Sequence, residues 1–136
     1  MNIYTDVVCD LFHSGHVSFF KTICDNYPNC NLIVGLMSDE ECINYKRKPI
    51  YNIEERYNIL SSIKYINKVI KNATMPITES FIKEHNIDLV IHGDDISKES
   101  ENYWYKTPIL NNIYKNVPYT ENVSTSKIIE KIKLLK

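Results

Sequence analysis

The strongest constraint on the fold of this chain is a series of short apolar runs, each followed by a polar segment and a stretch of helical length. Residues 32–37 (LIVGLM) are continuously apolar, and residues 89–91 (LVI) form a second such run. A continuous apolar run of this length is typical of a strand buried on both faces. Such strands, alternating with helical stretches, predict βαβ units with right-handed crossovers and a parallel sheet.

Local patterns predict where the individual elements lie. The predicted strands are residues 2–8, 32–37, 68–71 and 89–91. Apolar residues recur at helical spacing from Phe20 to Tyr27. The starts of four further helices are marked by capping side chains: Ser38, Asn52, Thr78, and either Ser124 or Thr125. The stretch 97–116 is polar and aromatic and is predicted to be partly helical, without assigned bounds.

Length and composition restrict the class of protein. The 136 residues contain no repeat or linker and fit one α/β domain over 1–136. The net charge of -1 argues against a protein held to nucleic acid mainly by charge. The four cysteines form no C-x-x-C pair, which argues against a zinc site, and Asp6 and Asp10 interrupt the only candidate for a signal peptide. No run approaches the roughly 18 apolar residues of a membrane span. We therefore expect a cytoplasmic protein with reduced thiols.

The polar segments that follow three of the predicted strands converge. In a parallel sheet, ligands bind at the carboxyl ends of the strands. The segments after the first, second and fourth strands are residues 9–16, 38–48 and 92–95. Because all three reach the same edge of the sheet, we expect them to surround one crevice.

The segment His13-Ser14-Gly15-His16 stands between a predicted strand and a predicted helix. Gly15 permits close approach of a ligand to the backbone, and a helix N-terminus attracts anions. Two imidazoles placed there can donate hydrogen bonds to phosphate oxygens and stabilise charge in a phosphoryl-transfer transition state. The alternative is a pair of surface histidines beside a turn. Half of the four histidines fall within these four residues, which favours the functional interpretation.

Three other charged segments have two interpretations each. Lys46, Arg47 and Lys48 lie in a basic loop, residues 46–51, which either clamps a triphosphate or is simply solvated; for Arg47 and Lys48 we expect a solvated loop. Arg56 is either the partner of a carboxylate or a phosphate ligand. The pair at 94–95 (Asp-Asp) either caps a helix or binds a metal, a ribose hydroxyl or a cationic group.

Together these segments resemble the cytidylyltransferase family, in particular the catalytic domains of the cholinephosphate and ethanolaminephosphate enzymes and, more distantly, the glycerol-3-phosphate enzymes. The resemblance covers almost the whole chain. Residues 10–16 (DLFHSGH) are similar to the signature loop of the family. The other matching segments, in order, are residues 32–40 (LIVGLMSDE), 55–57 (ERY), 68–73 (KVIKNA), 86–95 and 123–129 (VSTSKII).

The resemblance implies a Rossmann-like domain, often a homodimer, that transfers CMP from CTP to a phosphorylated alcohol and releases pyrophosphate. Mg²⁺ is expected to accompany the triphosphate, with no metal held by the protein itself. Phosphoethanolamine and phosphocholine are both candidate acceptors. The alternatives are a glycerol-3-phosphate cytidylyltransferase, an adenylyltransferase of the same superfamily, or a non-catalytic nucleotide-binding module. No long amphipathic membrane-binding helix is seen, so we expect no membrane control in cis.

The resemblance also implies roles for individual residues. His13, His16 and Lys46 would be catalytic, with Lys46 bridging CTP and the acceptor phosphate. The nucleotide-binding residues would be Val8, Cys9, Asp10, His13, His16, Arg56, His92, Asp94, Tyr119, Thr120, Ser124 and Thr125. The acceptor-binding residues would be Lys46, Met75, Asp95 and Tyr105.

Several positions depart from the family pattern. Tyr119 stands where the family has an arginine that faces phosphate, so a guanidinium is missing unless Lys115 or Lys127 substitutes for it. Met75 stands at the position of a tryptophan that the choline enzymes carry. Trp104 and Tyr105 are available to rebuild part of an aromatic cage for a cation.

Lys98 stands where a tyrosine is expected, and a lysine there would repel a choline cation. The segment from His92 to Ile96 is closer to the ethanolamine and glycerol-phosphate enzymes.

Overall fold

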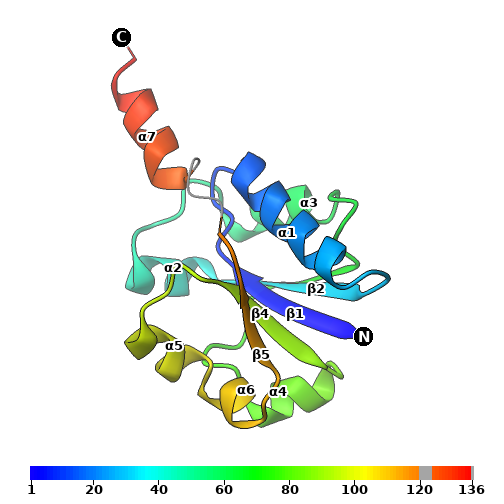
Figure 1. The fold of residues 1–136 in the computed structure, drawn as a ribbon. Helices are drawn as coiled ribbons and strands as arrows, with labels where there is room; N and C mark the ends of the chain where they lie inside the picture. The colour runs from blue at the N-terminus through cyan, green and yellow to red at the C-terminus, as the bar shows by residue number, and fades with distance from the viewer. Residues whose placement is uncertain (120–123, 136) are drawn as a thin grey trace.

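A five-stranded parallel sheet forms the centre of the molecule (Figure 1). The computed structural model describes residues 1–119 and 124–135. The strands lie side by side in the order β3-β2-β1-β4-β5, and all of them are parallel. The chain adds β2 and β3 on one side of β1, and then adds β4 and β5 on its other side. They are β1 (Asn2–Val7), β2 (Asn31–Leu36), β3 (Lys68–Ile70), β4 (Leu89–Gly93) and β5 (Tyr114–Val117). The predicted single α/β domain with a Rossmann-like parallel sheet is confirmed.

Helices cover both faces of this sheet (Figure 1). The helices α1 (Ser14–Asn26) and α3 (Ile53–Leu60) lie on one face. The opposite face carries α4 (Glu79–Glu84), α5 (Lys98–Trp104) and α6 (Lys106–Leu110). A short helix, α2 (Asp39–Tyr45), follows β2 at the carboxyl edge. This two-sided cover explains why the central strands read as continuous apolar runs.

Alternate residues of each strand enter two separate hydrophobic clusters. Ile3 packs with Phe20 of α1, whereas its neighbour Tyr4 packs with Phe81 of α4 on the other face. The same alternation divides β2, in which Gly35 leaves room for Tyr4: a Cβ at Gly35 would overlap the Tyr4 hydroxyl. Both faces of the sheet are therefore covered by apolar side chains, so polar groups can contact a ligand only at the ends of the strands.

The predicted helix caps are confirmed, and one alternative is resolved. Ser38 accepts a hydrogen bond from the backbone N–H of Glu41 at 3.1 Å. The side chains of Asn52 and Thr78 cap α3 and α4 in the same way. Ser124, rather than Thr125, caps α7 (Thr125–Lys133), because its Oγ accepts from the backbone of Lys127 at 3.1 Å.

The stretch 97–116 contains more regular structure than its composition predicts. It forms α5, α6 and most of β5, which pairs with β4 in register from Val90 opposite Tyr114 to Gly93 opposite Val117. The strand β5 was not predicted, because it is short, lies at the sheet edge and has the polar residues Lys115 and Asn116 at its centre instead of an apolar run.

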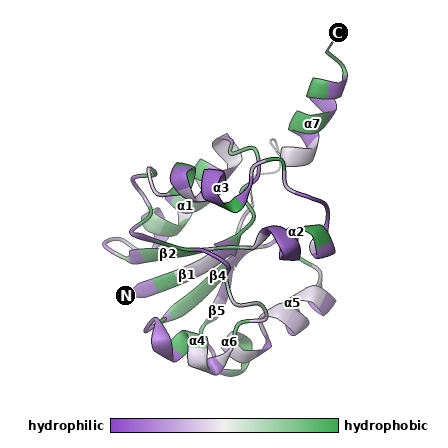
Figure 2. Ribbon diagram, turned by 180° about the vertical axis from the view of Figure 1, so that it is seen from behind, coloured by the Kyte–Doolittle hydropathy of each residue, from purple (hydrophilic) through white to green (hydrophobic). Residues whose placement is uncertain are grey.

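The helix α7 stands away from the rest of the molecule (Figure 1). None of its residues is buried, and apolar side chains at Ile132 and Leu134 are exposed. Apolar and polar residues alternate around it, as the coloured ribbon shows (Figure 2). Across residues 1–119 and 124–135, no helix combines the length and the apolar character needed to cross a membrane.

Candidate functional site

A cavity of about 340 Å³ lies at the carboxyl edge of the sheet, where the sequence predicts a crevice. Its walls come from the segments after β1, β2, β4 and β5 and from the start of α7. Cavities of this size are typical of small-ligand sites. The predicted site residues that line it are Val8, Cys9, Asp10, His16, Lys46, Met75, His92, Asp95, Tyr105, Tyr119, Ser124 and Thr125.

Four predicted site residues are placed differently. His13 stacks on His16, with 3.8 Å between the ring centroids, and does not itself line the cavity. Asp94 lies just outside it and accepts a hydrogen bond from the backbone N–H of Tyr119 at 3.1 Å. Arg56 is wholly buried away from the cavity. Thr120 is outside the described residues.

His13 and His16 cap the start of α1 reciprocally. The Nδ1 of His13 accepts a hydrogen bond from the backbone N–H of Gly15 at 3.0 Å. The Nδ1 of His16 accepts from the backbone N–H of His13 at 3.1 Å. We expected free backbone donors at this helix start, but the N–H groups of His13 and Gly15 are used within the loop. Of the two histidine rings, only that of His16 lines the cavity and can donate to a ligand there.

This arrangement fixes the tautomer of both rings. A nitrogen that accepts a hydrogen bond carries no proton, so the proton of each neutral ring is on Nε2. Burial and the neighbouring His13 lower the pKa of His16 to about 3, although Asp10 opposes the shift. Burial also lowers the pKa of His13. In the free protein, His16 therefore presents a neutral Nε2–H donor to the cavity.

His92, on the other side of the cavity, has the opposite tautomer. Its Nδ1 lies 2.8 Å from the carbonyl oxygen of Gly93, which can only accept. The proton of the neutral ring is therefore on Nδ1, and Nε2 is an acceptor. The two histidines that line the cavity are thus complementary: His16 donates a hydrogen bond and His92 accepts one.

The first residues of the signature loop adopt a left-handed backbone. Cys9 has φ 55 and Leu11 has φ 48, a region that non-glycine residues rarely occupy. Strained conformations of this kind persist only where the surroundings fix them, and they cluster at functional sites. Burial raises the pKa of the Cys9 thiol, which disfavours the reactive thiolate form.

Asp10 ties the signature loop to the basic loop. Its Oδ2 accepts from the backbone of Ile50 at 2.8 Å, and its Oδ1 accepts from the backbone of Tyr51 at 2.9 Å. Its carbonyl oxygen accepts from the Oγ1 of Thr125 at 2.7 Å. Because both carboxylate oxygens are occupied by backbone N–H groups, Asp10 acts as a brace between three wall segments of the cavity.

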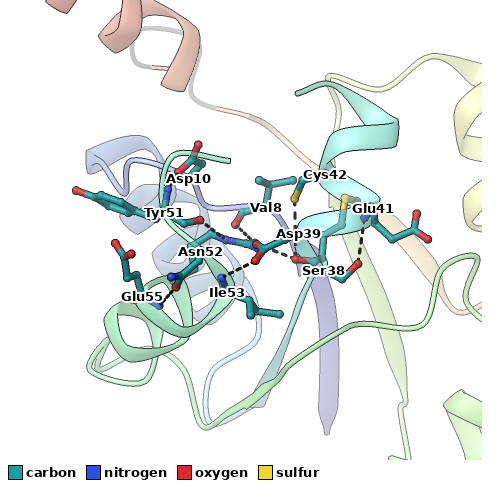
Figure 3. A network of polar contacts seen from close by, with 12 residues as sticks. Val8, Asp10, Ser38, Asp39, Glu41, Cys42, Tyr51, Asn52, Ile53 and Glu55 are labelled. Carbon is teal, nitrogen blue, oxygen red and sulfur yellow. Dashed lines mark hydrogen bonds and ion pairs between the residues drawn. The ribbon is translucent and has the colours of Figure 1, made fainter. Parts of the chain in front are cut away.

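Arg56 braces the same region from inside the protein, where its hydrogen-bond acceptors on Val8, Asp39 and Tyr51 lie close together (Figure 3). Its guanidinium donates to the carbonyl oxygens of Val8 and Met37, both at 2.9 Å, and to that of Tyr51 at 3.1 Å. It also forms an ion pair with Asp39 at 2.6 Å. Of the two interpretations of Arg56, the structure therefore selects the carboxylate partner. The expectation that it contacts the nucleotide is corrected, because its donors are spent on these buried acceptors.

A second buried carboxylate, Asp6, also lines the cavity. It accepts a hydrogen bond from the hydroxyl of Tyr105 at 2.6 Å. Burial raises the pKa of Asp6, while the Tyr105 hydrogen bond and the nearby His92 partly oppose that shift. Trp104 and Met75 also line the cavity. A carboxylate beside aromatic rings is a site that suits a small cation.

Sequence reasoning did not select several of the lining residues. They include Asp6, Tyr45, Arg47, Ser100 and Ser126. Asp6 could have been found, because it is an acidic residue inside a predicted strand and next to its carboxyl end. Arg47 was expected in a solvated loop, and the structure instead places it in the cavity wall.

Within residues 1–119 and 124–135, no group of three or more His, Cys, Asp or Glu side chains is placed to hold a metal ion. Mg²⁺ commonly binds through one or two carboxylates together with substrate phosphates. The carboxylates at the cavity are Asp6, Asp10 and Asp95, of which Asp95 is exposed. A magnesium ion that arrives with a triphosphate is compatible with this set.

Comparison with known proteins agrees with this geometry. The family model of cytidylyltransferase-like proteins matches residues 8–131. The chain is 37% identical over 133 residues to choline-phosphate cytidylyltransferase A of Homo sapiens, which covers 97% of this chain and 36% of that protein. It is 31% identical over 141 residues to ethanolamine-phosphate cytidylyltransferase of Arabidopsis thaliana, which covers 98% of this chain and 32% of that protein. The chain thus spans about a third of the length of these curated relatives.

Solved structures show the same fold. The lipopolysaccharide core biosynthesis protein from Thermoplasma volcanium superposes with a TM-score of 0.71 at 20% sequence identity, over 90% of this chain and 98% of that one. At this identity the similarity concerns the fold alone. The match of the family model over residues 8–131, together with the histidine pair at the carboxyl edge of the sheet, shows that the chain belongs to the cytidylyltransferase-like family.

Proposed function

We propose that this chain transfers a cytidylyl group from CTP to a small phosphorylated amino alcohol, phosphoethanolamine or phosphocholine, with release of pyrophosphate. The observation that carries the proposal is the paired donor at the start of α1. The backbone N–H of His13 occupies the Nδ1 of His16 and leaves its Nε2–H to donate, and His16 lines the cavity together with Lys46 and Thr125. The relatives named above as choline- and ethanolamine-phosphate cytidylyltransferases support the choice of nucleotide and acceptor.

In the proposed reaction an oxygen of the acceptor phosphate attacks the α-phosphorus of CTP. The bond between that phosphorus and the β-phosphate oxygen breaks, and pyrophosphate leaves. No covalent intermediate with the protein is required, so the protein contributes positioning and charge stabilisation. Mg²⁺, carried with the triphosphate, would neutralise part of the phosphate charge.

His16 and Lys46 have distinct roles in this proposal. Negative charge grows on the oxygens around the α-phosphorus in the transition state, and the Nε2–H of His16 stabilises it by hydrogen bonding. Protonation of the ring would require its Nδ1, which already accepts the backbone N–H of His13, so His16 donates this hydrogen bond as a neutral imidazole. Lys46 is exposed, lies at the C-terminal end of α2, and carries a mobile ammonium group that suits a bridge between the two substrates.

Asp6 and Tyr105 would receive the cationic end of the acceptor. An ammonium group beside Asp6 favours the ionised carboxylate, and the Tyr105 hydroxyl already holds one of its oxygens. Trp104 and Tyr105 add aromatic surface for a cation. This pairing supports an amino alcohol over glycerol phosphate, which has no positive charge.

The test is an assay of pyrophosphate release with CTP or ATP, Mg²⁺, and a panel of phosphorylated alcohols. We expect release with CTP and a phosphorylated amino alcohol. The variant His16→Ala should lower kcat on the order of 10²-fold or more, as expected for the loss of a transition-state donor. A matched control is His85→Ala, because His85 stacks near Phe81 on α4 and does not line the cavity.

Two outcomes would replace the proposal. Release with ATP alone would make the chain an adenylyltransferase. Binding of CTP without release of pyrophosphate for any acceptor would make it a nucleotide-binding module. The presence of Tyr119, where the family has an arginine, favours this alternative. A homodimer and a cytoplasmic location stay predictions, which sedimentation and cell fractionation would test.

A further inference from the structure

We propose that Arg47 binds the phosphates of the nucleotide and is the guanidinium donor of this site. The inference deepens the proposed function and rests on it. It contradicts our expectation that Arg47 belongs to a solvated loop.

The side chain of Arg47 has the position that such a role requires. It lines the cavity together with Lys46, His16 and Tyr119. Its Nε is buried and has no hydrogen-bond partner among residues 1–119 and 124–135. In the same part of the chain, no carboxylate forms an ion pair with it.

Arg47 as a whole is only half-buried, but its buried Nε–H is costly to leave unpaired, because it has lost water without gaining an acceptor. Phosphate oxygens would satisfy this donor. The planar guanidinium also matches two phosphate oxygens at once, which makes arginine well suited to polyphosphates. The contrast with Arg56 is informative, because Arg56 has buried acceptors for its Nε, Nη1 and Nη2 and does not reach the cavity.

The backbone around Arg47 is held at both sides. On one side, the N–H of Arg47 donates to the carbonyl oxygen of Cys42 at 3.0 Å, at the end of α2. On the other side, Asp10 accepts from the backbone of Ile50 and Tyr51. These bonds attach the basic loop to the signature loop, which carries His16. The backbone on either side of Arg47 is therefore fixed against the loop that carries His16, whereas Asp6 and Tyr105 are the residues proposed for the acceptor cation.

The positions of the neighbouring residues reduce the number of cationic side chains that could donate hydrogen bonds to phosphate. Lys115 and Lys127, the candidates considered for a missing phosphate ligand, do not line the cavity. Tyr119 does line it and is half-buried. An arginine introduced at position 119 would therefore bring a second guanidinium to the cavity that Arg47 lines.

The experiment compares the binding of CTP with Mg²⁺, and of inorganic pyrophosphate, by calorimetry in four proteins: the wild type, Arg47→Ala, Lys48→Ala, and the double variant Arg47→Ala with Tyr119→Arg. Lys48 is the matched control, since it is a neighbouring exposed cation that does not line the cavity. Thermal unfolding checks that each variant is folded. The Michaelis constants for CTP and for phosphoethanolamine are then measured separately.

We expect Arg47→Ala to weaken binding of CTP and of pyrophosphate by about 10- to 100-fold, the range for charge-assisted hydrogen bonds. The KM for CTP should rise and the KM for phosphoethanolamine should change little. Lys48→Ala should change binding by no more than about threefold. Tyr119→Arg should restore most of the affinity that Arg47→Ala removes, which a structural role for Arg47 would not explain.

Equal effects of Arg47→Ala and Lys48→Ala would overturn the proposal, as would a rise in the acceptor KM alone. If the wild type binds CTP but transfers it to no acceptor, the proposed function fails while the binding measurements still decide the role of Arg47. If the wild type binds neither CTP nor pyrophosphate, both proposals fail.

Discussion

Both histidines of the signature loop, His13 and His16, accept hydrogen bonds from backbone N–H groups before any ligand is present. Each Nδ1 accepts a backbone N–H, at 3.0 and 3.1 Å, so each ring keeps its proton on Nε2. Burial lowers the pKa of both rings. A neutral donor of fixed orientation costs little reorganisation when charge develops next to it, which is the property that an electrostatic catalyst needs.

The first prediction at the residue scale concerns these tautomers. Long-range proton–nitrogen NMR at pH 7 should show His16 as a neutral ring protonated on Nε2 and His92 as a ring protonated on Nδ1. Because the pKa of His16 is lowered to about 3, titration of the free protein from pH 7 to pH 5 should leave His16 neutral. A His16 signal that titrates near 6.5 would contradict the hydrogen bond to its Nδ1.

A second prediction concerns Asp6 and pH. Because burial raises the pKa of Asp6 in the folded protein, its contribution to stability is present below the ordinary value of 3.8 and is lost as the pH rises through the raised pKa. Asp6→Asn keeps an acceptor for Tyr105 but removes the charge. The variant should be more stable than the wild type at pH 7, by about 1 kcal/mol or more.

Urea unfolding at pH 3.5 and pH 7 measures this difference, which should shrink at the lower pH. Under the proposed function, the same substitution should raise the KM for phosphoethanolamine and leave that for CTP nearly unchanged. Lower stability of Asp6→Asn at pH 7 would show that the ionised carboxylate is compensated in the fold.

A third prediction concerns Arg56. Lysine in its place keeps the charge but cannot reach all the acceptors, so buried carbonyl oxygens such as those of Val8 and Met37 lose their donors. We expect Arg56→Lys to lower the free energy of unfolding by about 2–4 kcal/mol. Lys21→Ala is the control, because its pair with Asp25 is exposed and its loss should leave the free energy of unfolding nearly unchanged. Equal losses in the two variants would contradict the role of Arg56 as an internal brace.

At the scale of elements, the basic loop is part of the cavity wall because it is tied to other segments. It has no regular secondary structure, yet Asp10 holds the N–H groups of Ile50 and Tyr51, and Pro49 is buried. Loops of this kind are able to present side chains as accurately as helices do. The position of Lys46 and Arg47 thus depends on a carboxylate more than thirty residues earlier.

The prediction at this scale tests that tie. Asp10→Asn removes one of the two carboxylate acceptors and the charge, so the amides of Ile50 and Tyr51 should exchange with solvent at least about tenfold faster, for a loss of about 1.4 kcal/mol in local opening free energy. Hydrogen exchange followed by NMR measures this. The amide of Glu55, which Asn52 caps in α3, is an internal control and should keep its rate. Unchanged exchange at Ile50 and Tyr51 would show that the loop is held by other contacts.

At the scale of the whole molecule, the α/β body and α7 contribute differently. The body contains both hydrophobic clusters, whereas α7 has no fully buried residue; one of its contacts with the body is the hydrogen bond from Thr125 to the carbonyl oxygen of Asp10. The start of α7 nevertheless forms part of the cavity wall through Ser124, Thr125 and Ser126. The helix therefore matters more for the site than for the stability of the fold.

Deletion of residues 124–136 tests this division. We expect the midpoint of thermal unfolding to fall by only a few degrees, because about 1 kcal/mol corresponds to roughly 4 °C in a domain of this size. Affinity for CTP should fall by about tenfold or more, since hydrogen-bonding groups of the wall are lost. Ile132→Asp, at an exposed position, should change neither quantity. Loss of the body fold on deletion would show that α7 packs on it.

The sequence by itself determined the parts of this protein that depend on local physics. Continuous apolar runs such as 32–37 require burial on both faces, so they predicted the central strands and hence the parallel sheet. Capping side chains at Ser38, Asn52 and Thr78 accept hydrogen bonds from residues three positions on, so the helix starts could be located. The histidine pair at the carboxyl edge followed from this order of elements.

Only the tertiary structure decided how the charged side chains are used. Arg47 and Arg56 lie nine residues apart in a basic and acidic stretch, and nothing in their spacing separates them. Arg56 is buried because carbonyl oxygens of Val8, Met37 and Tyr51 meet around it, while Arg47 keeps an unpaired Nε in the cavity wall. The free energy of a charged group depends on which acceptors surround it, and those acceptors are brought together by the fold and not by the local sequence.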